Sequence, residues 1–562
     1  MPNPVIAIGL DAAATPLIER WTAEGVLPTL AALRAQGAYA PVRAYPHHVG
    51  ETPWTTFHTG CAPSTLGYWS PIRFQEGSYD LEEVGAYDYQ EFPPFYALGD
   101  EYRVAIFDAP QTRVCDGVNG LQVLAWGAHS PQTASESSQP DLLHELIARH
   151  GNHPALNKDS ASIHDAEALR QLKVRLETGI ARRSAICQDL LQRERWDLFL
   201  TVFDGFHSAG HYFWHLSDPN HPLHRLAGSQ HDLLRDVFVA ADRAIGEVIA
   251  KAPADASVVV FSPHGMEANV LDLNSTVFLP ELLYRFSFPG HAALAPARSG
   301  VSPSPLVAGK RVAQEGWSRV IWNLTREQSS IKSLLKRRLP ARYFGRLEPW
   351  FGAPQQHDPA SPFRHGKPGW MEKSQPAVWF RHLWPHMKAF ALPSFSDGYI
   401  RINLQGREPA GIVAPSEYDR LCNDLTHLLH GVVDARTGQP VVRDVIRTRR
   451  SPDMRDPHLP AADLVVRWRS QRPADVIDSP TLGRIGPVPF ARSGGHNRDG
   501  FLLARGAGIP AGALLPEGRT VDLAATILNL MHAPIPDRID GRSLIARESP
   551  HIPSQHAERQ LA

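Results

Sequence analysis

Short runs of consecutive apolar residues recur along the first half of the chain. Each run ends at a Gly, Asp or Pro and is followed by a longer segment with apolar residues every three or four positions. Continuous apolar runs are typical of strands buried on both faces, and the longer segments are typical of amphipathic helices. The runs are Val5–Leu10, 104–107, 121–126, Leu198–Phe203 and Ser257–Ser262, and helices are expected over 16–36, 141–150, 165–193 and 232–251. This alternation predicts an α/β fold with a largely parallel central sheet.

The alternation breaks near residue 279, where Pro and Ser become frequent, and it resumes after residue 373. Later strands are expected at 398–404, 464–468 and 500–504. A chain of 562 residues exceeds one ordinary hydrophobic core, so an insertion or a second domain is expected. We predict a core formed by 1–278 and 374–550, an inserted cap at 279–373, and a tail at 551–562.

Charge and composition narrow the classes of partner. The chain has 57 basic and 58 acidic residues, so no overall field attracts nucleic acid or anionic lipid. Its apolar runs are shorter than a membrane helix requires, and the first one, ending at Asp11, is too short for a signal peptide. The four cysteines have neither metal-site nor disulfide spacing. We therefore expect a cytoplasmic protein without nucleic-acid or membrane partners, while its oligomeric state stays open.

Three histidines carry the strongest chemical signal. His207 and His211 follow the run Leu198–Phe203, and residues four apart on a helix lie on the same face. His496 lies in Ser-Gly-Gly-His-Asn, where the glycines allow a loop to bring its backbone close to a buried site. Three neutral imidazoles and one open position are the ligand set of a catalytic zinc ion. We predict a zinc site here, with another divalent metal as the alternative.

Polar residues also follow three of the expected strands. They are Asp11, Asp204 and His264. In open α/β sheets the ligand site forms beyond the carboxyl ends of the strands, so these side chains are expected to converge. Asp204 has two interpretations: it fixes the tautomer of a neighbouring imidazole, or it only forms the turn after the strand.

Six segments, in this order, resemble the alkaline phosphatase superfamily, and specifically its type I phosphodiesterase/nucleotide pyrophosphatase-like branch. They lie at 5–11, 53–60, 207–211, 258–266, 494–500 and 521–544. The resemblance implies a three-layer αβα sandwich with an inserted cap. It also implies a centre of one or two zinc ions that hydrolyses a phosphate or phosphate-like ester of a small anionic molecule.

The family's metal ligands are carried over residue by residue. One metal site corresponds to His207, His211 and His496, with His207 standing where the family has Asp. A neutral imidazole in place of a carboxylate leaves the metal a stronger Lewis acid. The other site corresponds to Asp11 and His264, but Pro263 stands where the family has a ligating Asp.

The nucleophile is less clearly marked, because the family's register places Gly50 at the attacking position. Thr52 precedes Pro53, and a Thr N-cap followed by Pro is a strong helix start. Thr52 is thus either a nucleophile at a helix N-terminus or a cap without chemistry, and Glu51 is a candidate base or ligand. No substrate-binding residue is identified.

Three functions remain open at the level of sequence. The first is a metal-dependent phosphodiesterase or phosphohydrolase with Thr52 as nucleophile. The second is a mononuclear three-histidine zinc enzyme of altered, non-phosphoryl chemistry with Glu51 as general base. The third is a catalytically weakened binding protein of the same fold.

Overall fold

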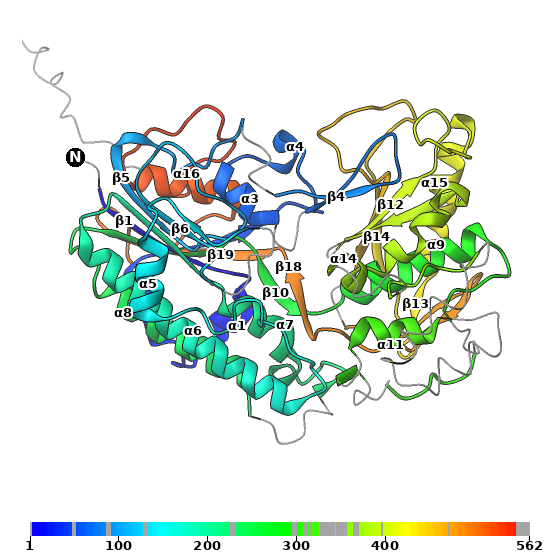
Figure 1. The fold of residues 1–562 in the computed structure, drawn as a ribbon, viewed down its shortest axis with the longest axis horizontal. Coiled ribbons are helices and arrows are strands. Elements are labelled where there is room, and N and C mark those ends of the chain that lie inside the picture. Colours follow the sequence, from blue (N-terminus) through cyan, green and yellow to red (C-terminus); the bar gives the residue numbers. More distant parts are fainter. Residues whose placement is uncertain are drawn as a thin grey trace, which may run out of the picture.

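One large sheet organises the first part of the molecule (Figure 1). The computed structural model describes residues 3–47, 52–85, 91–127, 133–224, 231–294, 300–306, 312–313, 316–325, 343, 357–363, 370–394, 397–469 and 472–546. Within these residues ten strands pair in the order β20-β2-β19-β9-β1-β8-β5-β6-β7, with β21 also beside β2. Their bounds are β1 Val5–Leu10, β2 Ala38–Arg43, β5 Gly99–Phe107, β6 Val118–Leu124, β7 Glu136–Ser137, β8 Leu198–Phe203, β9 Ser257–Ser262, β19 Asp499–Arg505, β20 Ala513–Leu514 and β21 Gly518–Arg519.

The middle of this sheet is parallel, as the sequence predicts. Strands β9, β1, β8, β5 and β6 run in one direction, while β19 and β7 are antiparallel to their neighbours. Val5 of β1 is opposite both Leu198 of β8 and Ser257 of β9, so these three strands end at the same edge. Asp11, Asp204 and His264, which follow them, therefore meet at that edge.

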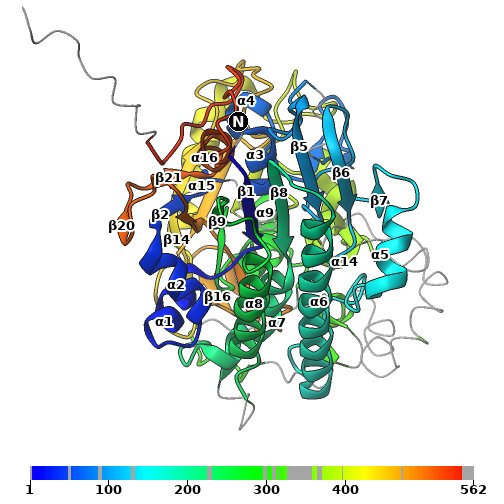
Figure 2. The same ribbon diagram turned by 90° about the vertical axis from the view of Figure 1, so that its left-hand side faces the viewer.

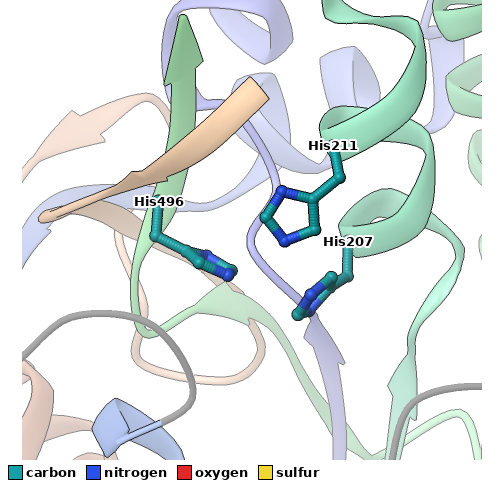
Figure 3. Close-up of side chains that lie close together, drawn as sticks. All are labelled: His207, His211 and His496. Carbon is teal, nitrogen blue, oxygen red and sulfur yellow. The ribbon is translucent and has the colours of Figure 1, made fainter. Parts of the chain in front are cut away.

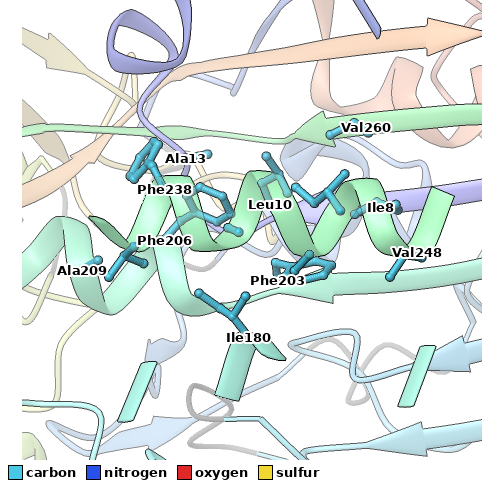
Figure 4. Close-up of a cluster of buried hydrophobic side chains, with 14 of the residues drawn as sticks. Ile8, Leu10, Ala13, Ile180, Phe203, Phe206, Ala209, Phe238, Val248 and Val260 are labelled. Atoms are coloured by element: carbon cyan, nitrogen blue, oxygen red, sulfur yellow. The ribbon is translucent and has the colours of Figure 1, made fainter. Parts of the chain in front are cut away.

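Helices cover both faces of the sheet (Figures 1 and 2). One face packs on α1 Thr15–Ala23, α2 Pro28–Gln36, α5 Leu142–His150, α6 Ala166–Arg193, α7 Gly205–Ser217 and α8 Leu233–Ile249, and the other on α3 Thr52–Thr59 and α16 Thr520–Leu530. Along β1, Ile6, Ile8 and Leu10 belong to the first core (Figure 4), and Val5 and Ala7 belong to the second. Burial of both faces explains the continuous apolar runs, and the three-layer αβα arrangement is confirmed.

The single helix expected over 16–36 is wrong, because the segment forms the two helices α1 and α2. Gly25 adopts a positive φ of 75°, which ends the first helix, and Pro28 begins the second. Proline is well accommodated at a helix start because its missing N–H has no partner there in any case.

A second lobe, which we define as residues 270–490, surrounds a separate apolar core (Figure 1). It holds an antiparallel sheet in the order β11-β12-β15-β14 and a smaller sheet β13-β16-β17. Its elements are a π-helical turn Asn274–Phe278, α9 Leu279–Ser287, α11 Trp317–Leu324, α14 Trp370–Ser374, the 3₁₀ helices Pro376–His386 and Pro415–Glu417, β11 Ala389–Leu392, β12 Gly398–Ile402, α15 Tyr418–His430, β13 Val433–Asp434, β14 Val442–Arg447, β15 Leu464–Trp468, β16 Ile477–Ser479 and β17 Gly483–Ile485.

The strands expected at 398–404 and 464–468 are present as β12 and β15, and both lie in the second lobe rather than in the central sheet. Strand β12 is buried along its whole length, and β15 nearly so, so their sequences resemble those of central parallel strands. Strand β19 does return to the central sheet, beside β9. The domain boundaries stay a prediction, and the tail 551–562 lies outside the described residues.

Two small pairs of strands connect the lobes. The hairpin of β3 Ile72–Phe74 and β4 Leu81–Glu83 follows α4 Pro63–Leu66, and Phe74 packs into the core of the second lobe. Strands β10 Gly265–Ala268 and β18 Gly494–Asn497 pair with each other where the chain leaves and re-enters the first lobe. No helix among the described residues is long and apolar enough to cross a membrane. The cytoplasmic location stays a prediction.

Buried histidines make the fold sensitive to acid. Burial lowers the pKa of His58 to about 4, of His215 to about 3 and of His221 to about 4. An unfolded histidine takes up its proton near pH 6.5, so between that pH and about 4 the unfolded chain binds more protons than the folded one. The free energy of unfolding consequently falls as the pH falls through this window.

We expect the His58→Gln variant to lose less stability than the wild type between pH 6.5 and pH 4. The neutral amide still has a donor for the carbonyl of Pro110, which accepts from His58 Nε2, but it has no proton to gain. The difference reaches up to about 3 kcal/mol. Urea unfolding curves at several pH values measure it, and parallel pH profiles for the two proteins would contradict the prediction.

Candidate metal centre

Helix α7 brings the first two histidines together. It begins directly after β8 and Asp204, so it starts at the carboxyl edge of the sheet. His207 and His211 lie one turn apart on its buried face, with ring centroids 4.6 Å apart. The helical spacing expected from the sequence is therefore present.

His496 approaches the same place from β18 (Figure 3). The expected loop is in fact a strand, in which His496 is opposite Met266 of β10. A Cβ atom on Gly494 would lie 2.1 Å from the carbonyl oxygen of Gly210, so glycine is required for this strand to lie against α7. The ring of His496 is consequently 4.8 Å from the rings of both His207 and His211.

Hydrogen bonds fix the tautomers of two of these rings. His211 Nδ1 is 2.8 Å from the carbonyl oxygen of Gly494, which only accepts, so Nδ1 carries the proton. His207 Nδ1 is 3.0 Å from Asp11 Oδ2 and donates to this carboxylate. Each ring therefore keeps the lone pair of Nε2 for another partner, as in metal-binding histidines whose second nitrogen is held by a carboxylate or carbonyl.

The third ring is also suited to binding a cation. Burial and the neighbouring histidines lower the pKa of His496 well below its usual value, so the ring is neutral at neutral pH. Its Nδ1 is buried, and no hydrogen-bond partner for it occurs in the described part of the chain. One nitrogen from each of the three rings lies within 4.8 Å of the others. Three ligands of one tetrahedral zinc ion lie roughly 3.4 Å apart, so small inward ring movements suffice, and the residues fit such an ion.

Asp11 and His264 complete the group of predicted metal residues. Asp11 Oδ1 accepts a hydrogen bond of 2.8 Å from Trp54 Nε1 and lies 3.8 Å from His264 Nε2. The ring of His264, fully buried, is 5.1 Å from that of His496. All five residues predicted as metal ligands thus form one buried group, which we call the histidine cluster: Asp11, His207, His211, His264 and His496. Which of them bind metal stays a prediction.

The candidate nucleophile begins a helix next to this cluster. Thr52 is the first residue of α3 and is buried, and Trp54, two residues later, donates to Asp11. The first turn of α3 therefore packs against the cluster. Glu51 and Gly50 lie outside the described residues.

Asp204 has a different partner from the one considered in the sequence. Arg183 Nη2 donates to Asp204 Oδ1 at 2.8 Å and to Asp108 Oδ2 at 2.6 Å. Asp11 holds the imidazole of His207, and Asp204 joins the start of α7 to α6 and to the end of β5.

Arg492 is a residue of the site that the sequence reasoning missed. Its Nε and Nη2 donate to the two carboxylate oxygens of Asp272 at 2.9 and 2.8 Å, and its Nη1 donates to His211 Nε2 at 3.0 Å. In the sequence, the feature that could have indicated Arg492 was its position four residues before His496. The acceptor Asp272, far away in sequence, was not foreseeable from that segment.

We expect single substitutions of His207, His211 or His496 by Ala to remove the bound metal, since two imidazoles hold a cation far more weakly than three. We expect Asp11→Asn to weaken metal binding about 10- to 100-fold, because Asp11 Oδ2 accepts the hydrogen bond that orients His207. Metal content after dialysis, measured by mass spectrometry, tests both.

The matched control is His215→Ala. His215 is buried on the next turn of α7, but its Nδ1 is hydrogen-bonded to Ser493 Oγ, so its removal leaves the metal content unchanged. Full metal content in His496→Ala would show that the three rings do not form the site.

Comparison with known proteins gives the family. Among solved structures, phosphonoacetate hydrolase from Sinorhizobium meliloti 1021, in complex with phosphonoformate, is 12% identical over 95% of this chain and 96% of its own, with a TM-score of 0.46. Human ectonucleotide pyrophosphatase/phosphodiesterase 5 is 10% identical over 95% and 96% of the two chains, with a TM-score of 0.41. No curated protein matches the sequence.

The sequence profile described as type I phosphodiesterase/nucleotide pyrophosphatase matches residues 5–286, which include the five parallel strands at the middle of the sheet, α3, α7 and four of the five residues of the histidine cluster. Members of this family are metal-dependent hydrolases that act on phosphate esters, as the sequence motifs led us to expect. The chain belongs to the type I phosphodiesterase/nucleotide pyrophosphatase family.

Proposed function

We propose that the protein hydrolyses a phosphate or phosphate-like ester of a small anionic molecule at a single zinc ion held by His207, His211 and His496. The observation that carries this proposal is the convergence of three buried imidazole nitrogens within 4.8 Å. Two of the rings have their Nδ1 atoms committed to Asp11 and Gly494, which supports binding through Nε2.

The proposal of one ion rests on Asp11. Both of its carboxylate oxygens are engaged, Oδ2 by His207 and Oδ1 by Trp54, which supports an orienting role. Pro263 offers no ligand where the family has a second carboxylate. His264 and Asp11 alone are too few ligands for a second zinc ion. Metal analysis that finds two equivalents would overturn the single-ion proposal.

Bound zinc would supply a Lewis acid for the phosphoryl oxygens and lower the pKa of an attacking hydroxyl. In this proposal Thr52 Oγ1 attacks the phosphorus atom from the N-terminus of α3, where backbone N–H groups favour the negative charge of a phosphoryl group. The ester P–O bond breaks, and the leaving alkoxide takes up the proton of the Thr52 hydroxyl. Water then hydrolyses the phosphothreonine, which releases the phosphate group and restores the hydroxyl. Trp54 holds the helix against Asp11 and so fixes the direction of approach. The buried surroundings of Thr52 exclude bulk water.

Arg492 is proposed to orient the substrate. The Nε2 lone pair of His211 either accepts from Arg492 or binds a cation, because it cannot do both. When it binds a cation, the Nη1 group of Arg492 is proposed to donate to a phosphoryl oxygen in place of His211, while Asp272 still holds the guanidinium in place. An arginine braced in this way is well suited to a phosphate group.

We expect Thr52→Ala to lower kcat for bis(4-nitrophenyl) phosphate by about a thousandfold or more, as loss of a catalytic nucleophile does in other hydrolases. The matched control is Thr55→Ala, because Thr55 is buried on the same helix one turn later. If Thr52→Ala keeps its activity while Glu51→Gln loses it, Thr52 is only a helix cap.

Arg492→Lys is expected to reduce kcat/KM about 10- to 100-fold without changing the metal content, because lysine cannot donate to Asp272 and to the substrate at once. Arg498→Lys, in the same segment but hydrogen-bonded to the carbonyl of Ala44, serves as the control. Equal kcat/KM values for the two variants would remove Arg492 from the proposal.

A second candidate function is favoured by the loss of the second metal's carboxylate at Pro263. A mononuclear three-histidine centre with Glu51 as general base would act on a non-phosphoryl substrate. This function predicts that the metal-loaded wild type does not hydrolyse phosphate diesters or monoesters. It also predicts that the wild type hydrolyses carboxylic esters and that Glu51→Gln does not.

A further inference from the structure

A cavity of about 500 Å³ lies between the two lobes, apart from the histidine cluster. One wall is formed by the segment 66–84 of the first lobe, which includes the hairpin β3–β4. The other wall comes from Leu392, Pro393 and Tyr399 and from the segment 449–461 of the second lobe. None of the five residues of the histidine cluster lines it, and neither does Thr52. Its volume is in the range of small-molecule binding sites.

The walls combine apolar and aromatic side chains with polar and charged ones. Trp69, Ile72 and Phe74 contribute from the first wall, and Leu392 and Leu459 from the second. The indole N–H of Trp69 donates to the carbonyl of His458, which ties the two walls together. A molecule with an apolar body is thus suited to the cavity.

The wall also contains a buried guanidinium group, that of Arg449. Arg449 is only 3% exposed, and it lines the cavity. Its Nη1 donates to the carbonyl oxygens of Pro460 and Ala462 at 2.7 and 2.6 Å. Its Nε and Nη2 have no acceptor among the described residues. Its hydrogen bonds therefore go to uncharged oxygens, and no carboxylate in the described part of the chain forms an ion pair with it.

The charged groups around Arg449 leave its positive charge without a partner of its own. Arg401 donates to Glu408, and Arg407 donates to both Glu408 and Asp463, so two carboxylates serve two other guanidinium groups. Burial lowers the pKa of Arg449, and the charges of Arg401 and Arg407 lower it further, against the opposing effect of Asp463. A buried charge without a partner is costly, and an anion with hydrogen-bond acceptors would relieve this cost.

The other charged residues that line the cavity do not cancel the positive charge of Arg449. Among its lining residues Arg73 and Arg455 are balanced in number by Glu76 and Asp456. Glu76 is largely exposed and lies near Arg401 rather than Arg449. The cavity therefore combines an apolar interior with one uncompensated positive charge.

We propose that this cavity is a second binding site, for a small molecule that joins one anionic group, a carboxylate or a phosphate, to an apolar or aromatic body. The anionic group is bound by Nε and Nη2 of Arg449, and the body contacts Trp69, Phe74 and Leu392. The proposal is independent of the metal centre, since it uses none of that centre's residues.

The test is ligand-detected NMR on the full chain with three probes: 4-phenylbutyrate, phenylphosphonate and the uncharged 4-phenylbutan-1-ol. We expect both anions to bind and the alcohol to bind at least about tenfold more weakly, as expected for loss of a hydrogen bond to a charged group. The Arg449→Gln substitution should weaken the binding of both anions by a similar factor.

Three further variants separate this site from others. Ala461→Trp fills the cavity while keeping the side chain of Arg449 in the protein, and it should abolish binding of both anions to this cavity. This variant keeps the test decisive if Arg449→Gln does not fold. Arg455→Gln, at the rim, should change affinity less than threefold, because Arg455 is exposed and its bond among the described residues is to the carbonyl of Pro452. His496→Ala should leave the binding of 4-phenylbutyrate unchanged.

Two results would overturn the proposal. One is that neither anion binds, or that both bind equally well to the wild type, Arg449→Gln and Ala461→Trp. The other is that binding is lost in His496→Ala but kept in Arg449→Gln, which would place the anion at the histidine cluster and would bear on the proposed function instead.

Discussion

The carboxylate of Asp11 is the point at which the layers of the first lobe meet. It lies at the end of β1 and accepts from His207 of α7, on one face of the sheet, and from Trp54 of α3, on the other. A buried carboxylate without such donors would cost several kcal/mol in desolvation, so the two helices and the strand stabilise one another's positions. Both the orientation of His207 and the approach of α3 depend on this one side chain.

This arrangement also sets the charge of the site. The family places a carboxylate where this chain has His207, so the three proposed ligands are all neutral. The nearby charged pair of Arg492 and Asp272 adds no net charge. A divalent cation would therefore keep most of its charge toward the substrate, opposed mainly by Asp11. Such a site favours anionic substrates more strongly than a carboxylate-rich one.

Local patterns predicted much of this molecule. The spacing of His207 and His211 and their place after β8 follow from helix periodicity and strand ends, which short segments specify. Strands β12 and β15 were expected, but their sheet was not, because burial on both faces looks the same in either sheet. The contacts of Asp11 with His207 and of Arg492 with Asp272 join residues 196 and 220 positions apart, so they depend on strand order and lobe packing. The Asp204–Arg183 pair spans only 21 positions, but it depends on how α6 packs beside β8 and α7.

Strand β18 links the assembly of the site to the completion of the chain. During synthesis His207 and His211 emerge long before His496, which is separated from them by the entire second lobe. β18 is seated only when it pairs with β10 and when Gly494 reaches Gly210. A nascent chain therefore presents two histidines, which would hold a cation weakly, and acquires the third only after the second lobe has been synthesised. The order of the chain thus delays completion of the proposed three-histidine site until the sequence of both lobes has been made.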